Sequence, residues 1–238
     1  MAKRAEGSGR AVGRSQAVHR ALKRAILEQA LPPGTKLPED SIGERMGVSR
    51  TLVREALVRL GEEGLVEHRP NRGASVAQPS LEDGLHLFRI RGAHELLVVE
   101  SLCGQLGEEQ VEALKAHIAM ENAAAKEGDA PRSIRLAGEF HVLLAEMTGN
   151  ATLIRFVNEV VVRSSLILSL YGRPHSSDCA VTEHREVLDA LVEGDRSRAM
   201  SLMDSHLHAI TSRALIMEEP EKDAMDVLLR FAAEEGLA

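Results

Sequence analysis

Three histidines stand in the second half of the chain, each inside an apolar pattern with helical spacing. They are His141 in "EFHVLLAEM", His184 in "TEHREVLDALVEGD" and His206 in "MDSHLHAI". Histidines on three separate helices can converge inside a bundle, which is how metal sites in helical bundles are built. Neutral imidazoles suit a divalent metal ion, here Zn²⁺ or Ni²⁺ before Fe²⁺ or Cu²⁺. Each histidine taken alone is equally compatible with a hydrogen-bonded core residue. His208 is two residues beyond His206 and therefore points to another face.

A second set of residues suits the recognition of nucleic acid. The stretch "GVSRTLVREAL" places Ser49, Arg50, Thr51 and Arg54 along the exposed start of a predicted helix. Arginine can bind guanine O6 and N7, or a phosphate, with two hydrogen bonds. The hydroxyls can bind phosphate oxygens beside the N–H groups of the helix start. In the alternative interpretation, the arginines pair only with neighbouring glutamates.

The elements around this stretch form a helix-turn-helix pattern. A first helix is expected over residues 15–29, with Ser15 as a candidate N-cap, and "LPPGTKLP" ends it. A short helix over residues 39–46 stops at Gly47, and Ser49 caps the helix that follows. A helix, a tight glycine turn and a second capped helix are typical of a helix-turn-helix.

A β-hairpin is expected directly after these helices. "LVEH" and "ASV" have the character of strands, and "RPNRG" between them has the character of a turn. This hairpin would be a wing, with Arg69, Asn71 and Arg72 at its tip, within reach of the DNA backbone or the minor groove.

The remainder of the chain shows no strand-like alternation. Breakers separate six predicted helices and a short seventh near residues 221–234, so we expect an antiparallel all-helical bundle. The predicted fold class is therefore mainly α, with an N-terminal winged helix-turn-helix and a C-terminal bundle of six or seven helices. The predicted domains are a disordered basic tail over 1–14, a DNA-binding domain over 15–78 and a helical domain over 79–238.

Composition and charge agree with two domains that have different partners. Residues 1–79 hold 14 Lys and Arg against 9 Asp and Glu, whereas the whole chain has a net charge of −7. A basic front can meet a polyanion. Aromatic residues make up only 2% of the chain, which argues against a single-strand binder that stacks bases on aromatic rings.

The chain lacks the usual signs of export or membrane insertion. No apolar run approaches 18 residues, and the basic N-terminus has no apolar stretch like that of a signal peptide. Cys103 and Cys179 show no paired spacing, so we expect free thiols. The expected location is the cytoplasm, with no membrane partner.

The first part of the chain closely resembles the winged helix-turn-helix of GntR-type bacterial transcription regulators. The similarity rests on "PGTKL", "GVSRTLVREAL", "RLGEEGLVE" and "NRGASV". It implies that Arg50 and Arg54 contact operator DNA and that the wing residues Asn71 to Gly73 approach the minor groove. Leu52 replaces a common proline, and Asp40 stands where some members have an operator-contacting arginine.

The histidine frame resembles the FCD effector-binding domain of the FadR-like group within that family. The resemblance implies that His141, His184 and His206 bind a divalent metal and that the helical domain forms a homodimer. Many FCD domains have an aspartate one turn before the first histidine, where this chain has Ala137. We therefore expect three protein ligands, with water, effector or another side chain at the remaining positions.

Three further residues are candidates for binding the effector. The resemblance implies that Arg91 points to the effector, and an arginine matches a carboxylate well. His94 is three residues further along the same helix and is expected on the same face, either lining the pocket or exposed. Arg163 is a charged residue in an otherwise apolar helix, where it could snorkel, pair or meet an anionic effector.

These observations together predict a ligand-responsive transcription regulator and not an enzyme. We expect it to bind operator DNA as a dimer, to act as a repressor and to sense a small carboxylate near the metal. In one alternative the histidines are polar pocket residues without a metal. A metallohydrolase is disfavoured because the chain has no HExxH motif, and because Glu183, beside His184, faces away from it on a helix.

Overall fold

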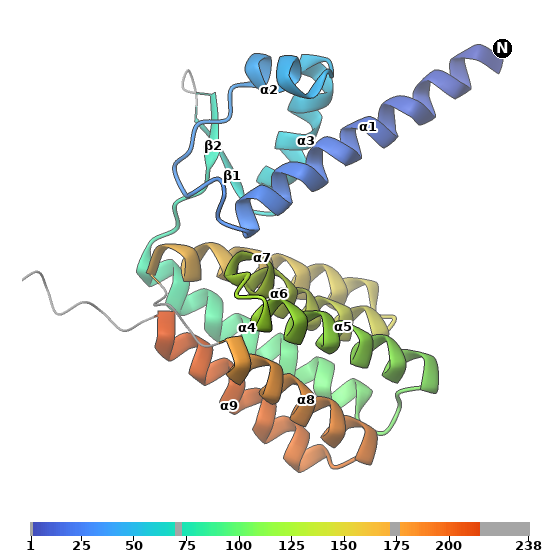
Figure 1. Ribbon diagram of the computed structural model, residues 1–238, viewed down its shortest axis with the longest axis vertical. Helices are drawn as coiled ribbons and strands as arrows, with labels where there is room; N and C mark the ends of the chain where they lie inside the picture. The colour runs from blue at the N-terminus through green and yellow to red at the C-terminus, as the bar shows by residue number, and fades with distance from the viewer. Residues whose placement is uncertain (1, 70–72, 172–176, 215–238) are drawn as a thin grey trace, which may run out of the picture.

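The computed structural model describes residues 2–69, 73–171 and 177–214. Its elements lie in two layers, with the winged part above the helical part (Figure 1). The elements in chain order are α1 (Ala2–Leu27), α2 (Glu39–Met46), α3 (Arg50–Glu62), β1 (Val66–Arg69), β2 (Gly73–Val76), α4 (Leu81–Leu102), α5 (Glu108–Lys126), α6 (Ala130–Met147), α7 (Ala151–Tyr171), α8 (Ser177–Glu193) and α9 (Arg196–Ala214). This confirms the predicted fold class. The predicted helix near residues 221–234 lies outside the described residues.

The winged domain is built from short elements whose ends are capped as the sequence predicts. Gly47 ends α2 in the left-handed region, with φ 62°, and Ser49 then accepts a hydrogen bond from the Leu52 N–H at the start of α3. The strands β1 and β2 pair antiparallel, with Val66 opposite Val76. Glycine permits the sharp turn at Gly47 because it has no Cβ to clash in that conformation.

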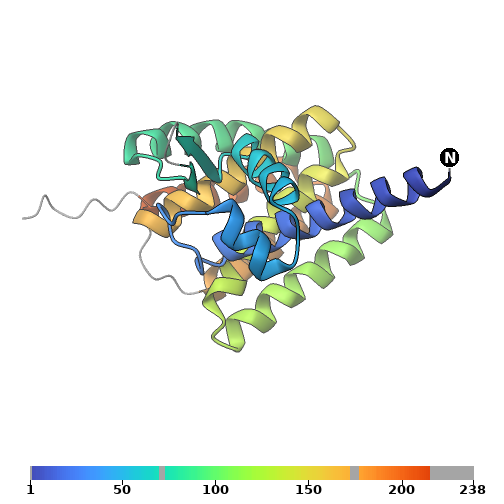
Figure 2. The same ribbon diagram turned by 90° about the horizontal axis from the view of Figure 1, so that it is seen from above.

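The first helix differs from its prediction. Residues 1–14 are predicted as a disordered tail, but α1 begins at Ala2 and projects beyond the winged domain (Figures 1 and 2). Alanine, lysine and arginine are strong helix formers, and they continue the helix in spite of the glycines between them. Ser15 is therefore not an N-cap. It lies in the middle of α1 and is fully buried.

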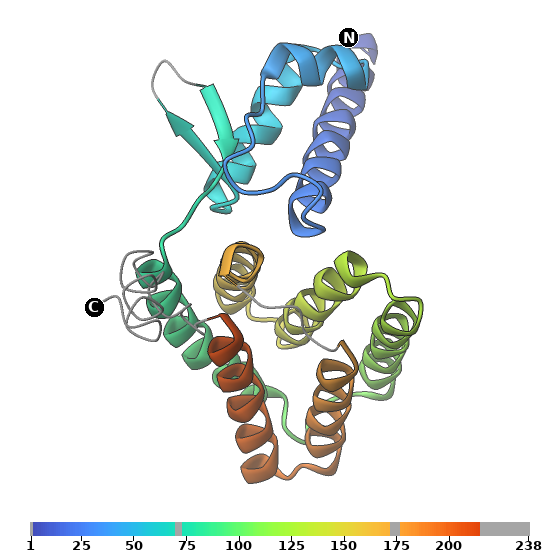
Figure 3. The same ribbon diagram turned by 60° about the vertical axis from the view of Figure 1, so that its left-hand side comes forward.

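Within the described residues, the six helices of the second domain form a closed ring. Neighbours in the ring are α4, α7, α6, α5, α8 and α9, and α9 packs against α4 again (Figure 3). Short glycine-containing connections, such as Gly128 between α5 and α6 and Gly194 between α8 and α9, turn successive helices back on one another. A ring of this kind directs one face of each helix to a shared interior.

The two domains share part of a core. Val162 and Leu166 of α7 are buried among the apolar residues of the winged domain, including Leu57 and Leu60 of α3. Arg135 of α6 forms an ion pair with Glu28, which follows α1, at 2.9 Å. The winged domain is therefore seated on α6 and α7 by both apolar burial and charge.

None of the helices in the described ranges is both long and apolar enough to cross a membrane.

Candidate metal centre and DNA-reading surface

The first turn of α3 carries the predicted DNA-reading residues on its exposed side. Ser49, Arg50, Thr51 and Arg54 are all exposed, and more than half of each arginine side chain is accessible. The apolar side of α3, with Val53, Ala56, Leu57 and Leu60, is fully buried in the winged domain. The register of the helix therefore fixes which side chains can enter a groove.

A single carboxylate holds both arginines. Glu39, at the start of α2, accepts hydrogen bonds from Arg50 Nε at 2.8 Å and from Arg54 Nη2 at 2.8 Å. The hydrogen bonds from Arg54 and then Arg50 lower the pKa of Glu39 to about 2. Asp40 adds a weaker contact, 3.3 Å from Arg50 Nη1. Glu39 therefore presents the two guanidinium groups side by side.

In the wing, Arg69 is the predicted DNA-contacting arginine that lies within the described residues. Arg69 closes β1, is exposed, and lies 3.1 Å from Glu67. Gly73 opens β2 with φ 75°, a conformation that favours glycine. Asn71 and Arg72, also predicted to reach DNA, lie outside the described residues.

The three predicted histidines meet in the interior of the helical ring. His141 comes from α6, His184 from α8 and His206 from α9, and none is more than 2% exposed. His206 Nε2 lies 3.2 Å from His141 Nε2 and 3.3 Å from His184 Nε2. One ligand atom from each residue falls within 4.8 Å of the others. The ring brings together residues separated by more than 60 positions in the sequence.

Each histidine has its own carboxylate on the opposite side of the imidazole. Glu95 of α4 lies 2.5 Å from His141 Nδ1, Glu121 of α5 lies 2.8 Å from His184 Nδ1, and Glu183 of α8 lies 2.5 Å from His206 Nδ1. A carboxylate behind a histidine fixes its tautomer and its orientation, as in the carboxylate–histidine–zinc arrangement. All three Nε2 atoms are thereby turned toward one centre.

The electrostatics of the cluster follow from its burial. Burial lowers the pKa of His141 to about 3, although Glu95 acts in the opposite direction. Burial also lowers the pKa of His184 well below its ordinary value. Burial raises the pKa of Glu95, but the charge of Arg91 and then that of His141 outweigh this and leave it well below its ordinary range. Burial raises the pKa of Glu121 to about 8.

The donor set fits a metal ion. A carboxylate 2.5 Å from Nδ1 of His141 and of His206 favours the neutral tautomer with its hydrogen on Nδ1, which leaves a lone pair on Nε2. Two lone pairs at 3.2 Å repel unless a cation lies between them, and the lowered pKa of His141 disfavours a proton. Tetrahedral coordination at zinc–nitrogen distances near 2.0–2.1 Å separates the nitrogens by about 3.3 Å. The two separations from His206 Nε2, at 3.2 and 3.3 Å, have this value.

Comparison with known proteins gives a family match for each of the two domains. Residues 14–76 match the family described as "Bacterial regulatory proteins, gntR family". Residues 86–209 match the FCD domain. The chain is 30% identical over 190 residues to an uncharacterized HTH-type transcriptional regulator from an unstable DNA locus of Streptomyces ambofaciens, covering 79% of this chain and 80% of that protein. The chain belongs to the GntR family.

One further sequence relative and one solved structure are also similar over most of the chain. The HTH-type transcriptional repressor RspR of Escherichia coli is 24% identical and aligns with 88% of this chain and 92% of its own length. The solved structure of E. coli McbR/YncC has the same fold, with a TM-score of 0.75 at 22% identity, over 84% of this chain and 96% of that one. GntR-family members are DNA-binding transcription regulators and not enzymes.

Within this GntR-family chain, the predicted effector residues do not gather at the histidines. Arg91 is buried but committed to protein partners, since its Nε donates to Glu95 at 2.6 Å and its Nη1 to Ser164 Oγ at 3.0 Å. It therefore holds Glu95, which in turn holds His141. These two bonds use two of the five guanidinium N–H groups, and the contact of Arg91 with an effector stays a prediction.

The other two candidates lie on the outside of the ring. His94 is partly exposed, donates from Nδ1 to the Ile90 carbonyl at 2.7 Å, and lies 5.6 Å from the Phe156 ring. It does not share the buried face of Arg91. Arg163 pairs with Glu159 at 3.0 Å, and its side chain packs against Gly64 of the winged domain. Both residues are thus separate from the histidine cluster.

Four glutamates that orient the site residues were not predicted from the sequence. Glu39, Glu95 and Glu121 belong to elements other than those of the side chains they hold. Only Glu183 carried a signal, because it precedes His184 and so faces away from it on α8, toward the neighbouring helix α9. His208, predicted not to be a ligand, is exposed and pairs with Asp204.

Proposed function

We propose that this GntR-family protein is a metal-dependent, ligand-responsive repressor that binds operator DNA as a homodimer in the cytoplasm. The observation that carries the proposal is the histidine cluster, in which three carboxylate-oriented imidazoles converge at distances suited to one ion. His141, His184 and His206 would hold a divalent metal, with Zn²⁺ or Ni²⁺ as the first candidates. The repressor role is supported by the name of the similar E. coli protein RspR.

The metal leaves room for an effector. Three imidazoles complete only part of a tetrahedral shell, and the aspartate position of related domains is occupied by Ala137. A small carboxylate would bind the open position of the ion and replace water there. Arg91 remains a second candidate contact for the carboxylate, because its bonds to Glu95 and Ser164 use only two of its five N–H groups.

A homodimer would present two recognition helices to two half-sites of an operator. The outer faces of α4 and α7 carry Ile90, Leu97 and Phe156, all large apolar residues with more than 40% of their surface exposed. Apolar residues exposed on adjacent helices are typical of a surface that a second copy covers. Arg50 and Arg54 of each copy would then read base edges or phosphates.

The test measures operator binding by fluorescence anisotropy, with an operator selected from random DNA by the protein itself. The metal-loaded protein should bind this operator at least 1000-fold more tightly than random DNA of equal length, as specific regulators do. Removing the metal, or adding millimolar small carboxylates to the loaded protein, should change operator affinity. Wild-type protein that takes up no divalent metal would exclude the metal and would leave the alternative of a metal-free effector pocket.

A further inference from the structure

A cavity lies between the two domains, away from the histidine cluster. It has a volume of about 280 Å³ and is bounded by α1 of the winged domain and by α5, α6 and α7 of the helical domain. Small-molecule sites in proteins occupy about 300–1,000 Å³, so this cavity suits a ligand at the small end of that range. None of the three clustered histidines lines it.

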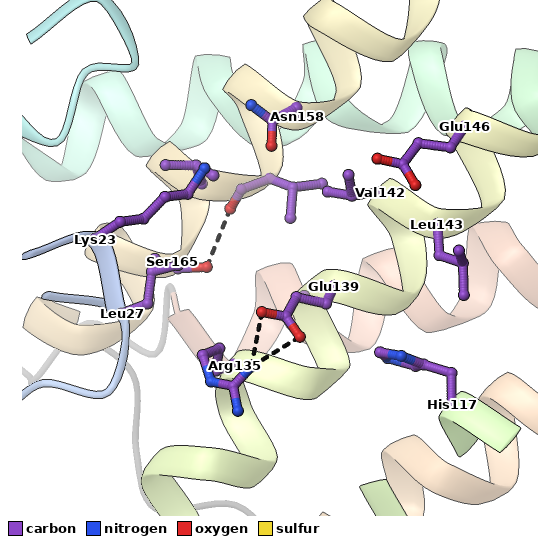
Figure 4. Close-up of a pocket in the computed structure, with 13 residues that line it drawn as sticks. Lys23, Leu27, His117, Arg135, Glu139, Val142, Leu143, Glu146, Asn158 and Ser165 are labelled. Atoms are coloured by element: carbon purple, nitrogen blue, oxygen red, sulfur yellow. Dashed lines mark hydrogen bonds and ion pairs between the residues drawn. The ribbon is translucent and has the colours of Figure 1, made fainter. Parts of the chain in front are cut away.

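The cavity has a cationic side and an apolar side. Figure 4 shows Lys23 and Arg135 on one side, with Val142 and Leu143 on the other. Val161 and Val162 of α7 add further apolar surface. A molecule that fills this space would meet Lys23 and Arg135 at one end and aliphatic side chains further along, with the carboxylates of Glu139 and Glu146 also at its border.

The two cations retain donors for a ligand. Arg135 donates from Nε to Glu28 at 2.9 Å and from Nη1 to both oxygens of Glu139, at 2.7 and 2.8 Å. Its Nη2 makes no hydrogen bond to the described residues, and a guanidinium carries two N–H groups there. Lys23 Nζ contacts Glu63 at 2.8 Å with one of its three N–H groups.

We propose that this interdomain cavity is a binding site for a small monocarboxylate with a short aliphatic chain. The carboxylate accepts hydrogen bonds from Arg135 Nη2 and Lys23 Nζ, and the chain packs against Val142, Val161 and Val162. A dianionic phosphate is disfavoured because Glu139 and Glu146 also line the cavity. The site is separate from the histidine cluster and needs no metal there.

Binding at this site acts on the arrangement of the domains. Lys23 belongs to the winged domain and Arg135 to the helical domain, so a ligand that contacts both favours the docked arrangement over any other. Arg135 and His141 lie six residues apart on α6. Helix α6 therefore carries residues of both the cavity and the histidine cluster.

The experiment is isothermal titration calorimetry of the full chain, without metal, using sodium hexanoate and, in parallel, neutral hexanamide. Hexanoate should bind with one site per chain, and hexanamide at least tenfold more weakly. Arg135→Gln should weaken hexanoate at least tenfold, whereas Arg132→Gln, on the same helix but outside the cavity, should leave it within twofold. Lys23→Gln should weaken hexanoate binding several-fold, and Arg20→Gln, at an exposed position of α1, is its control. Two independent variants keep the test decisive if one of them fails to fold.

Two further measurements separate this site from the proposed metal-linked effector. The variant with His141, His184 and His206 all replaced by Ala should still bind hexanoate. Loss of binding in that variant, with retention in Arg135→Gln, would place the carboxylate at the histidines and overturn the interdomain site while supporting the proposed function. Equal binding of hexanoate and hexanamide, or no saturable binding of either, would also overturn it.

Discussion

Glu39 in the winged domain and Glu95 in the helical domain each hold a basic side chain in place, but in opposite surroundings. The partners of Glu39 are arginines with more than half of their side chains exposed, whereas Glu95 and His141 are each 2% exposed. An exposed ion pair contributes only about 0.2–1 kcal/mol and is screened by salt, so DNA can replace it. A buried pair resists exchange because separating it leaves an uncompensated charge.

The two regions are therefore prepared for different partners. The arginines on α3 are kept together until a large polyanion arrives and supplies its own acceptors. The imidazoles are held rigidly around one point, with little freedom to rearrange, as a small ion with fixed bond lengths requires. This contrast gives four predictions that differ in size.

The largest expected effect is the loss of metal on removing the central imidazole. His206 lies within 3.3 Å of both other Nε2 atoms, so His206→Ala removes one of three ligands. Metal affinity should fall by more than about 100-fold, since even outer carboxylates contribute about 10–100-fold. Metal content by mass spectrometry and competition with a chelator measure it. His208→Ala is the matched control and should bind metal normally.

The second prediction concerns a carboxylate behind a ligand. Glu183→Gln leaves His206 in place but removes the charged acceptor of its Nδ1–H, so metal affinity should fall about 10–100-fold. Glu186→Gln, on the exposed side of the same helix, is the control. Unchanged affinity in Glu183→Gln would show that the imidazoles do not depend on their carboxylates for orientation, and would remove the contrast between the two regions.

The two regions also differ in how far the sequence alone could predict them. The DNA-reading residues lie in one short stretch, so local helix spacing alone placed Ser49, Arg50 and Arg54 on an exposed face. The histidines are far apart in the chain, and their convergence was predicted from bundle geometry and resemblance. The orienting glutamates Glu95 and Glu121 come from α4 and α5, helices that carry none of the three histidines. Only the packing of the ring reveals them.

The contacts of the predicted effector residues Arg91 and His94 also depend on how the helices pack. Arg91 has the sequence character of an effector ligand, but α7 places Ser164 against it, and Glu95 lies one turn away. The partners of a charged side chain across a bundle depend on which helices are neighbours, which one helix pattern does not encode. His94, expected either to line a pocket or to be exposed, is partly exposed, because an i,i+3 pair straddles the edge between a buried and an exposed face.

The third prediction tests the arginines themselves. Arg54→Ala should weaken operator binding by about 1–3 kcal/mol if the guanidinium makes a bidentate base contact, measured by anisotropy at fixed salt. Arg59→Ala is the control, because Arg59 is exposed further along α3, away from its first turn. Equal affinity of Arg54→Ala and wild-type protein for the operator would exclude Arg54 from the DNA interface.

The smallest expected effect concerns the carboxylate that holds these arginines. Glu39→Gln removes a negative charge near DNA and also releases both guanidinium groups, whereas Asp40→Asn removes the same charge but only one weak contact, at 3.3 Å. Both variants should bind random DNA more tightly, because nonspecific affinity depends on charge. Only Glu39→Gln should also lose several-fold in the ratio of operator to random affinity. If the two variants changed this ratio equally, Glu39 would act through its charge alone, and the exposed carboxylate would lack the orienting role that its buried counterparts have.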